Sequence, residues 1–373
     1  MANSGNTRHN IVKPTEVSSA TLQKFHTKLD AWYQVSGRHH LPWRNTQDAY
    51  AIWVSEVMLQ QTQVKTVLER FYMPFITQFP SITALAEASA ETLMKAWEGL
   101  GYYSRARNLQ KAAQHIILSS QALRGDPDWI AASPKAPRND GVTMPDTYEA
   151  LLALSGIGRN TAHAILAFAY HQPVAVMEAN VKRVLCRIFA LKSPSDELLW
   201  MLAQRLLNTK SPFHYNQAMM DLGAIICSKS QPDCVTCPAN AICRGKGAPL
   251  EYPARKQKKV PPIRKRILLA LYDDKMRFVV QVRSSEFLSG LYGFIELEQL
   301  PPHHNQWQHI GHITQSYSHF ILNADIYCAP ANTAQLKQFH NCFYTLADIA
   351  KLPLSRADSK MLKILSDYFS SSL

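Results

Sequence analysis

A glycine turn, a helix and a single carboxylate, all within residues 154–187, constrain this chain more than any other feature. Gly156 and Gly158, in Leu-Ser-Gly-Ile-Gly, can adopt backbone angles closed to other residues and place no side chain between the backbone and a ligand. An alanine-rich helix is expected at 160–170, and the amide groups at its start would be open to an anion such as phosphate. The turn therefore predicts either a simple connection between packed helices or a phosphate-binding hairpin.

Glu178 is the one carboxylate in the otherwise apolar run that precedes a second predicted helix. That helix carries Lys182, Arg183 and Arg187. A carboxylate at this point either begins the helix, where the helix dipole favours negative charge, or is a functional group held out of bulk water. Both interpretations remain open from the residues alone.

Composition favours a nucleic-acid partner and a reducing compartment. The 373 residues carry a net charge of +12, with a pI near 9.3 and 46% hydrophobic residues, which suits a protein of two or three domains that binds a polyanion. The polar start of the chain has no apolar core typical of a secretory signal, and no apolar run reaches membrane-spanning length. We expect a cytoplasmic monomer with no membrane association, close to the nucleoid if the source is bacterial.

Four of the seven cysteines lie in residues 227–243 with the spacing C-x6-C-x2-C-x5-C: Cys227, Cys234, Cys237 and Cys243. In a reducing compartment such a group predicts a metal or a cluster and not disulfides. Four thiolates can bind zinc, but the unequal spacing suits an iron–sulfur cluster equally on chemical grounds.

Glu56 lies in a predicted helix at 51–71 whose neighbouring side chains are apolar. A glutamate in apolar company has a raised pKa and can act as a general acid, although most glutamates on helices face water. Leu59, Gln60 and Gln61 follow in a run rich in amides, which can pair with base edges or simply face solvent.

Aromatic and basic residues adjoin each other at two further places. Trp43 and Arg44 follow a predicted helix at 20–35, and Tyr102 and Tyr103 precede Arg105 and Arg107. Such pairs suit base stacking beside phosphates, whereas packing of the rings in the core is the alternative. Gln217 lies in a predicted helix at 213–224 with a small-residue face.

The chain divides by composition into several segments. Residues 1–18 are predicted to be a disordered leader, and residues 119–144, rich in proline and glycine, a long inserted loop. Nine basic residues between 244 and 266 indicate a basic linker at 247–265. Beyond it, strands are expected at 267–272, 278–282, 309–314 and 320–328, with a closing helix at 359–369.

Taken together, the Leu-Ser-Gly-Ile-Gly turn, the run Ser-Glu-Val-Met-Leu-Gln-Gln-Thr-Gln-Val around Glu56 and the cysteine spacing resemble the MutY-type adenine DNA glycosylases of the helix-hairpin-helix, endonuclease III superfamily. The resemblance implies an α+β protein. Residues 19–246 would form an all-α helix-hairpin-helix glycosylase domain with a 4Fe–4S loop at 227–243. Residues 266–373 would form a small α/β Nudix-like domain that recognises 8-oxoguanine.

The same resemblance implies a role for each matching residue. Glu56 would protonate adenine, while Glu178, at the family's catalytic aspartate position, and Asn180 would serve the sugar. The substrate-binding residues would be Trp43, Arg44, Leu59, Gln60, Gln61, Tyr102, Gln217, Tyr317, Ser318 and His319. Gly156, Gly158, Lys182 and Arg183 would hold the DNA backbone, and the four cysteines a 4Fe–4S cluster.

Four positions depart from the family pattern. Ser155 replaces a proline, Tyr317 a phenylalanine, and Asn160 stands where endonuclease III has its Schiff-base lysine, so a monofunctional enzyme is expected. Glu178 replaces the aspartate and adds a methylene. The predicted function is removal of adenine mispaired with 8-oxoguanine or guanine in double-stranded DNA. The alternatives are a catalytically impaired form that still binds the lesion, and a glycosylase with a changed substrate.

Overall fold

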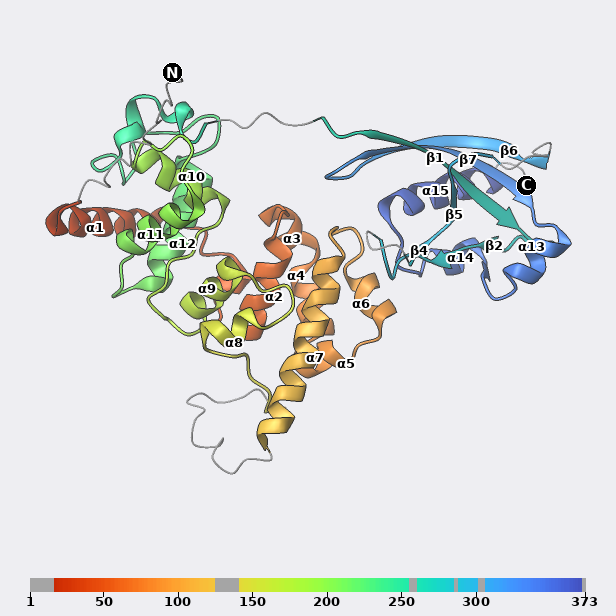
Figure 1. Cartoon of the computed structure of the whole chain (residues 1–373), viewed down its shortest axis with the longest axis horizontal. Helices are drawn as coiled ribbons and strands as arrows, with labels where there is room; N and C mark the ends of the chain where they lie inside the picture. Colours follow the sequence, from red (N-terminus) through yellow and green to blue (C-terminus); the bar gives the residue numbers. More distant parts are fainter. Residues whose placement is uncertain (1–16, 125–140, 255–259, 285–287, 301–305, 371–373) are drawn as a thin grey trace, which may run out of the picture. The chain divides into compact units, whose positions relative to one another are not determined.

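The computed structural model describes residues 17–124, 141–254, 260–284, 288–300 and 306–370, without the side chains of 121–124 (Figure 1). The chain forms two compact units. The first comprises Met1–Trp53, Pro145–Ala153 and Ile157–Gln257, and the second comprises Val54–Met144, Leu154–Gly156 and Lys258–Leu373. The predicted leader lies, up to residue 16, outside the described residues. Among the described helices, none combines the length and apolar character needed to cross a bilayer.

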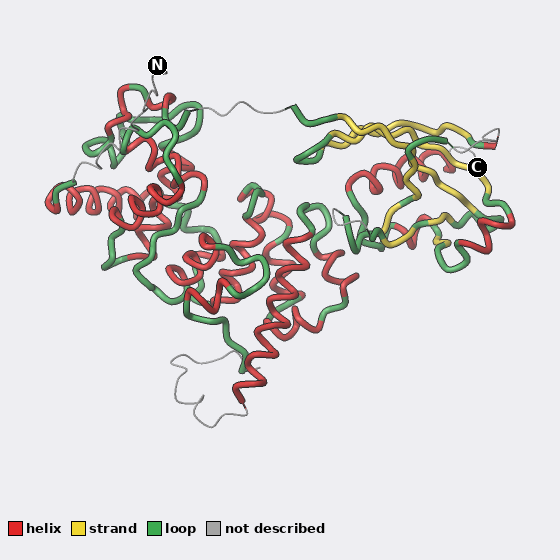
Figure 2. The backbone as a smooth tube through the Cα atoms, in the orientation of Figure 1, coloured by secondary structure: helices red, strands yellow, loops and turns green. Residues whose placement is uncertain are grey.

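The first unit is helical (Figure 2). Its helices pack around a large apolar core and a smaller one that includes Ala164 and Phe168. Its main helices are α1 (Ser19–Ser36), α8 (Tyr148–Leu152), α9 (Arg159–Phe168), α10 (Ala179–Ile188), α11 (Asp196–Leu206) and α12 (Pro212–Asp221), with short helical turns η1 (Pro42–Arg44), η3 (Leu222–Ile226), η4 (Arg244–Gly247) and η5 (Pro249–Glu251). In α1, the side chain of Ser18 caps the first turn, and Phe25, Leu29 and Tyr33 are buried at helical spacing. The predicted helix at 20–35 is confirmed.

The helices of the second unit begin with the end of α2 (Ala49–Leu59), which starts in the first unit. The others in the first part of this unit are α3 (Val64–Arg70), α4 (Tyr72–Gln78), α5 (Ile82–Glu87), α6 (Ala90–Ala96) and α7 (Ser104–Arg124). The prediction of one helix over 51–71 is wrong, because the chain turns at residues 60–63 and Gln61 adopts φ +58°. The α7 helix also runs six residues into the predicted loop at 119–144, since no proline or glycine interrupts it before Gly125. Residues 125–140 of that loop lie outside the described part.

The rest of the second unit is a mixed β-sheet with flanking helices (Figure 2). Its strands are β1 (Ile263–Tyr272), β2 (Phe278–Val279), β5 (Ile295–Leu297), β6 (Gln308–Ser316), β7 (Ile321–Pro330) and β8 (Phe343–Tyr344), in the order β6-β7-β1-β2-β8 with β5 paired to β1; β3 (Gln281–Val282) and β4 (Tyr292–Gly293) form a separate pair. Strand β1 runs parallel to β7 and pairs Leu268 with Ile326. Three of the four predicted strands are present, and β1 begins at Ile263, inside the predicted linker. The predicted strand at 278–282 is instead divided at Val280 into β2 and β3, which belong to different sheets.

The helices of this part are α13 (Thr333–Gln338), α14 (Leu346–Ile349) and α15 (Arg356–Ser370). The last matches the predicted closing helix at 359–369 and packs against β6. Met361 and Leu365 of α15 are buried in the same core as Leu268 and Ile326 of the sheet. An amphipathic helix therefore covers one face of the sheet.

Candidate active site

Glu178 follows a short extended segment, residues 173–177, whose backbone makes few hydrogen bonds to other backbone groups. Side-chain amides from two helices replace them. The amide of Asn216 on α12 accepts from the N–H of Val176 (2.9 Å) and donates to the carbonyl of Val174 (2.9 Å). Gln204 on α11 accepts from the N–H of Ala175 (3.0 Å) and donates to the carbonyl of Pro173 (2.9 Å).

The α9 helix secures the end of the same segment nearest Glu178. The Oδ1 of Asn160 accepts from the N–H of Met177 (2.8 Å), and the Nδ1 of His163 donates to the carbonyl of Ala175 (2.7 Å). Buried backbone groups left without partners would cost free energy, so these contacts fix the path of the segment. Asn160 is thus a structural anchor for the residue before Glu178.

Glu178 itself occupies the N-cap position of α10, with its carbonyl accepting the first helical bond from Lys182 (2.9 Å). The Nδ2 of Asn180 lies 3.4 Å from the Oε2 of Glu178. The Oε1 atom is buried and has no hydrogen-bond partner in the described part of the chain. Burial raises the pKa of Glu178, although Asn180, the N–H of Val181 and the charge of Arg183 oppose that rise. An unpaired carboxylate oxygen held out of water is suited to meet a positive charge.

Asn180 and Arg183 form the wall next to this carboxylate. Arg183 donates to the Oδ1 of Asn180 (2.8 Å) and to the carbonyls of Gly223 (2.7 Å) and Cys227 (3.0 Å). A Cβ atom added at Gly223 would lie 2.6 Å from the Cβ of Asn180, so a glycine is required there. Lys182 faces outward and pairs with Asp196 (2.9 Å). The guanidinium of Arg183 is therefore occupied within the protein, and its predicted contact with phosphate remains untested.

Arg44 is buried and does not stand free for a base as the sequence suggested. Its guanidinium forms two hydrogen bonds with the carboxylate of Asp221 (2.7 and 2.8 Å), which also accepts from the backbone and side chain of Arg38. Asp221 is fully buried, and Trp43 and Gln217 are almost fully buried. The Oε1 of Gln217 is buried and has no partner among the described residues.

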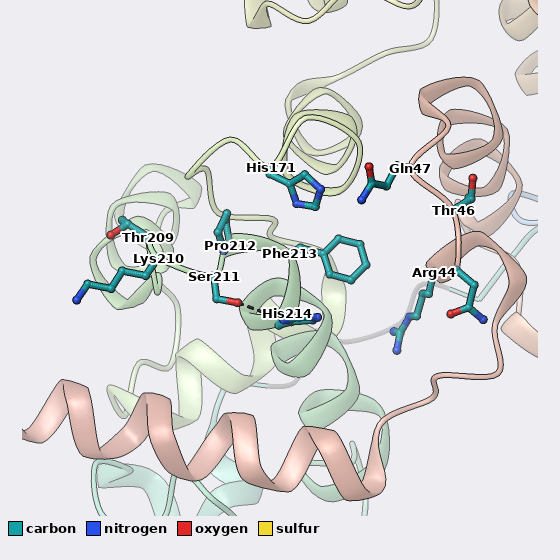
Figure 3. Close-up of a pocket in the computed structure, with 11 residues that line it drawn as sticks. Arg44, Thr46, Gln47, His171, Thr209, Lys210, Ser211, Pro212, Phe213 and His214 are labelled. Carbon is teal, nitrogen blue, oxygen red and sulfur yellow. Dashed lines mark hydrogen bonds between the residues drawn. The ribbon is translucent and has the colours of Figure 1, made fainter. Parts of the chain in front are cut away.

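A pocket of about 640 Å³ lies in the first unit, between the chain at Arg44 and the start of α12 (Figure 3). Two of its lining side chains, Pro212 and Phe213, are apolar, and the others are basic, hydroxyl or amide groups without a carboxylate: Arg44, Asn45, Thr46, Gln47, His171, Thr209, Lys210, Ser211 and His214. At the start of α12, the Oγ of Ser211 lies 3.2 Å from the Nδ1 of His214. Of the predicted site residues, Arg44 alone contributes to this lining.

The four clustered cysteines are all partly buried and near one another. Burial, together with the charges of the other three sulfurs, raises the pKa of Cys237 to about 12. Arg187 donates to the carbonyl (3.0 Å) and the Sγ (3.2 Å) of Cys227 and to the carbonyl of Ser228 (2.7 Å). Among the described residues, no three His, Cys, Asp or Glu side chains are arranged to bind a single metal ion.

The hairpin glycines differ in conformation. Gly156 adopts φ +79°, a left-handed angle that favours glycine, and a Cβ there would lie 2.8 Å from the Cβ of Asn108. Gly158 is the extended N-cap of α9, and no side chain caps this helix. A helix start that follows such a glycine turn is suited to hold an anion.

In the second unit, Glu56 is half-buried on α2 among the buried side chains of Val54, Val57 and Met58. Gln61 is exposed at the turn after α2, and Leu59 and Gln60 are half-buried. The sequence placed Glu56 in apolar company correctly, while its predicted raised pKa stays a prediction.

The two adjacent tyrosines separate. Tyr102 is 42% exposed with φ +50°, whereas Tyr103 is buried. Arg105 is also buried, so the suggestion that it lies beside phosphates is wrong. The core-packing alternative holds for Tyr103, and Tyr102 alone of the pair presents its ring to solvent.

The predicted reading loop of the last domain is a tight turn between β6 and β7, closed by a hydrogen bond from the N–H of Tyr317 to the carbonyl of Phe320 (2.8 Å). Ser318 and His319 are exposed and contact each other (3.1 Å). Tyr317 instead packs on the core of the sheet, and burial raises its pKa to about 12. The exposed part of the loop is therefore Ser-His.

The sequence analysis did not identify three residues whose side chains hold the segment before Glu178: Asn216, Gln204 and His163. A signal was present for Asn216, because an Asn-Gln pair in a helix with many buried residues requires buried hydrogen-bond partners. Nothing in the local sequence identifies those partners.

Residues 54–208 match the model of the HhH-GPD superfamily base excision DNA repair proteins. The chain thus contains a helical domain of that superfamily, followed by a sheet-rich region. It is 36% identical over 227 residues, 60% of this chain, to an adenine DNA glycosylase of Buchnera aphidicola subsp. Baizongia pistaciae (strain Bp). It is 40% identical over 239 residues, again 60% of this chain, to the adenine DNA glycosylase of Mus musculus.

The chain spans 58% and 42% of the lengths of these two relatives. Among solved structures, a thermostable thymine-DNA glycosylase matches 61% of this chain and 99% of its own, with a TM-score of 0.51 and 24% identity. That structure shares the helical fold.

Proposed function

We propose that this protein is a monofunctional adenine DNA glycosylase of base excision repair that removes adenine paired with 8-oxoguanine or guanine in double-stranded DNA. The observation that carries the proposal is Glu178, a largely buried carboxylate with one unpaired oxygen, on a segment fixed by four side chains. The similarity to proteins named adenine DNA glycosylase supports adenine as the base.

In the proposed reaction, adenine leaves the DNA stack at a cost of about a few kcal/mol. Glu56 donates a proton to the base, and the bond between base and sugar breaks with its electron pair moving to the base. The sugar becomes an oxocarbenium-like cation, which the carboxylate of Glu178 stabilises until water adds. Asn180 holds the Oε2 atom of that carboxylate, so the unpaired Oε1 is the oxygen presented to the cation.

Asn160 supports hydrolysis without strand cleavage. Cleavage through a Schiff base requires an amine nucleophile, and the amide of Asn160 is neither nucleophilic nor free, because its Oδ1 holds the N–H of Met177. We therefore expect an abasic site as the product.

A 4Fe–4S cluster is the proposed occupant of the loop at 227–243. The donor set is four cysteines, and in a 4Fe–4S cluster each cysteine binds a different iron. Such sulfurs stand further apart than the ligands of a single ion, which is compatible with the lack of a single-ion site among the described residues. The guanidinium groups of Arg187 and Arg183 would offset the negative charge of the cluster. When bound, the cluster would tie this loop to α10.

The DNA contacts are proposed from charge and geometry. The start of α9 would hold a phosphate, with Gly156 and Gly158 in the preceding turn. Gln60, Gln61 and Tyr102 would enter the duplex, and Ser318 and His319 would contact 8-oxoguanine. The net charge of +12 supports binding to DNA. We also propose a cytoplasmic monomer without membrane association, and the seven free cysteines fit that compartment.

The second candidate is a protein that binds the lesion but releases adenine slowly, and the extra methylene of Glu178 favours it. A displacement of about 1 Å in a catalytic group can cost on the order of a hundredfold in rate. Single-turnover release of adenine from an 8-oxoguanine:A duplex, compared between this chain and its Glu178→Asp variant, separates the two. Equal or slower release by the variant supports a working Glu178. A large gain in rate at equal duplex affinity would identify an impaired enzyme, and release of another base from a substrate panel would identify a changed substrate.

A further inference from the structure

Arg105 contacts two turns that are distant from each other in sequence. It lies on α7 and its side chain is buried. Its Nη1 atom donates to the carbonyls of Val57 (2.8 Å), Met58 (2.8 Å) and Gln60 (2.6 Å). The last carbonyls of a helix lack partners within the helix, so the guanidinium caps the end of α2.

The other terminal nitrogen of the same guanidinium holds the second turn. The Nη2 atom of Arg105 donates to the carbonyls of Gly101 (3.0 Å) and Leu100 (3.4 Å), and also to the Oγ1 of Thr62 (3.2 Å). One planar group therefore bonds both the turn at 59–62 and the turn at 100–102.

The environment of Arg105 is unusual for a buried cation. Its Cζ lies 5.5 Å from the ring centroid of Trp97 and 5.4 Å from that of Tyr102, and no carboxylate pairs with it in the described part of the chain. Burial lowers the pKa of Arg105 to about 10. Carbonyl dipoles and ring faces must therefore offset the cost of burying the charge, which makes the geometry of both turns essential to it.

Each turn carries an exposed side chain in a strained backbone conformation. Gln61 has φ +58° and Tyr102 has φ +50°, values that non-glycine residues rarely adopt. Such conformations persist where surrounding contacts enforce them. The carbonyls adjacent to both residues, of Gln60 and Gly101, are bonded by Arg105.

We propose that Arg105 is a positioning residue that braces the two turns as one unit, so that Gln61 and Tyr102 enter the duplex at a fixed spacing. This proposal rests on the proposed function for its DNA readout, but the brace itself can be measured without DNA. A lysine at this position would keep the charge while losing the planar fork that reaches both turns.

The first test is amide hydrogen exchange of the DNA-free protein. In Arg105→Lys, the turns at 59–62 and 100–102 should both exchange faster, while the rest of α7 is unchanged. Arg107→Lys is the matched control, because it removes a guanidinium from the same helix that bonds the carbonyl of Ser289 instead (2.6 Å). Unchanged exchange in both turns, or faster exchange in one turn only, would overturn the brace.

The second test is a double-mutant cycle for binding to an 8-oxoguanine:A duplex. Gln61→Ala and Tyr102→Leu should be non-additive in the native background by about tenfold or more in Kd, and additive in the Arg105→Lys background. Arg105→Lys itself should reduce the preference for the lesion duplex over a fully paired one by about ten- to a hundredfold.

The cycle in the native background keeps the proposal testable even if the Arg105 variants fold poorly. Independent effects of Gln61 and Tyr102 there would contradict the brace. If the native chain binds no lesion duplex but both turns respond together in hydrogen exchange, the proposed function fails while the brace stands.

Discussion

Replacing Glu178 by glutamine should make the protein more stable and less active at the same time. The substitution keeps the shape of the side chain and removes its charge. Burial disfavours the ionised carboxylate, and the Oε1 atom has no partner in the described structure to compensate. Replacing a glutamate that has only a structural role would not give both higher stability and lower activity.

The change in stability has a defined pH dependence. Because the pKa of Glu178 is raised in the folded protein, folding favours the protonated form. That preference is fully satisfied below the pKa of an unfolded glutamate and is lost as pH rises through the folded pKa. Glu178→Gln imitates the protonated form, so its gain in Tm over the native chain should be present at neutral pH and vanish in acid.

The loss of rate follows from the charge that the sugar acquires. Removing one preorganised electrostatic group from a transition state costs about 2.7–4 kcal/mol, or roughly a hundred- to a thousandfold in rate. Single-turnover adenine release from an 8-oxoguanine:A duplex should fall by that factor while the Kd of the duplex changes little. In the native chain, the acid limb of the pH–rate profile should lie above the range of an ordinary glutamate.

Asn180→Asp is a matched variant, because the side chain keeps nearly the same size. It adds a negative charge beside Glu178, whereas Glu178→Gln removes one. It should raise the pKa of Glu178 further and move the acid limb upward. A native rate in Glu178→Gln, or a lower Tm at neutral pH, would refute the assignment of Glu178 as a buried catalytic carboxylate.

Three further substitutions test the frame around the site. Asn216→Leu leaves the two backbone groups that its amide pairs unsatisfied and should cost about 2–6 kcal/mol in the free energy of unfolding, measured by denaturant titration; a cost below about 1 kcal/mol would contradict its role. Asp221→Asn breaks a buried ion pair and should cost about 3–5 kcal/mol. Burial alone raises the pKa of Asp221, but Arg44 and Arg38 hold it below the ordinary value. The stability that Asp221 contributes should therefore fall as pH drops through that lowered pKa. If Asp221→Asn loses stability in acid just as the native chain does, Asp221 is not the source of that acid dependence. Gly223→Ala brings a methyl group against the side chain of Asn180, so adenine release should slow by about tenfold or more with little change in duplex affinity, and an unaffected rate would show that Asn180 need not stay in place.

The sequence by itself determined the elements whose signal is local. The apolar spacing of α1, the start of α10 after Glu178, the strands β1, β6 and β7 and the closing helix α15 were all predictable, because periodicity records which face of an element is buried. Gly156 was predictable for a similar reason, since its left-handed angle is a property of one residue and its neighbours. The spacing of the four cysteines was likewise visible without any fold.

Only the tertiary structure decided how those elements are held. The α2 helix ends at Leu59 although the residues that follow continue a helical pattern, because Arg105, far along the chain, captures its last carbonyls. Arg44 pairs with Asp221 on another helix, whereas the sequence left open whether it meets a base or packs in the core. In both cases a buried charge takes the partner that the fold brings to it, and local sequence does not encode that partner.

The same distinction applies at the candidate active site. The sequence placed a carboxylate at residue 178 and an amide at residue 160, and so indicated which groups are present. It did not reveal that Asn160 holds the residue before Glu178, or that Asn216, some forty residues further along, holds the segment between them. The sequence specifies which chemical group each residue carries. The position and burial of those groups depend on contacts between helices that form only when the chain has folded.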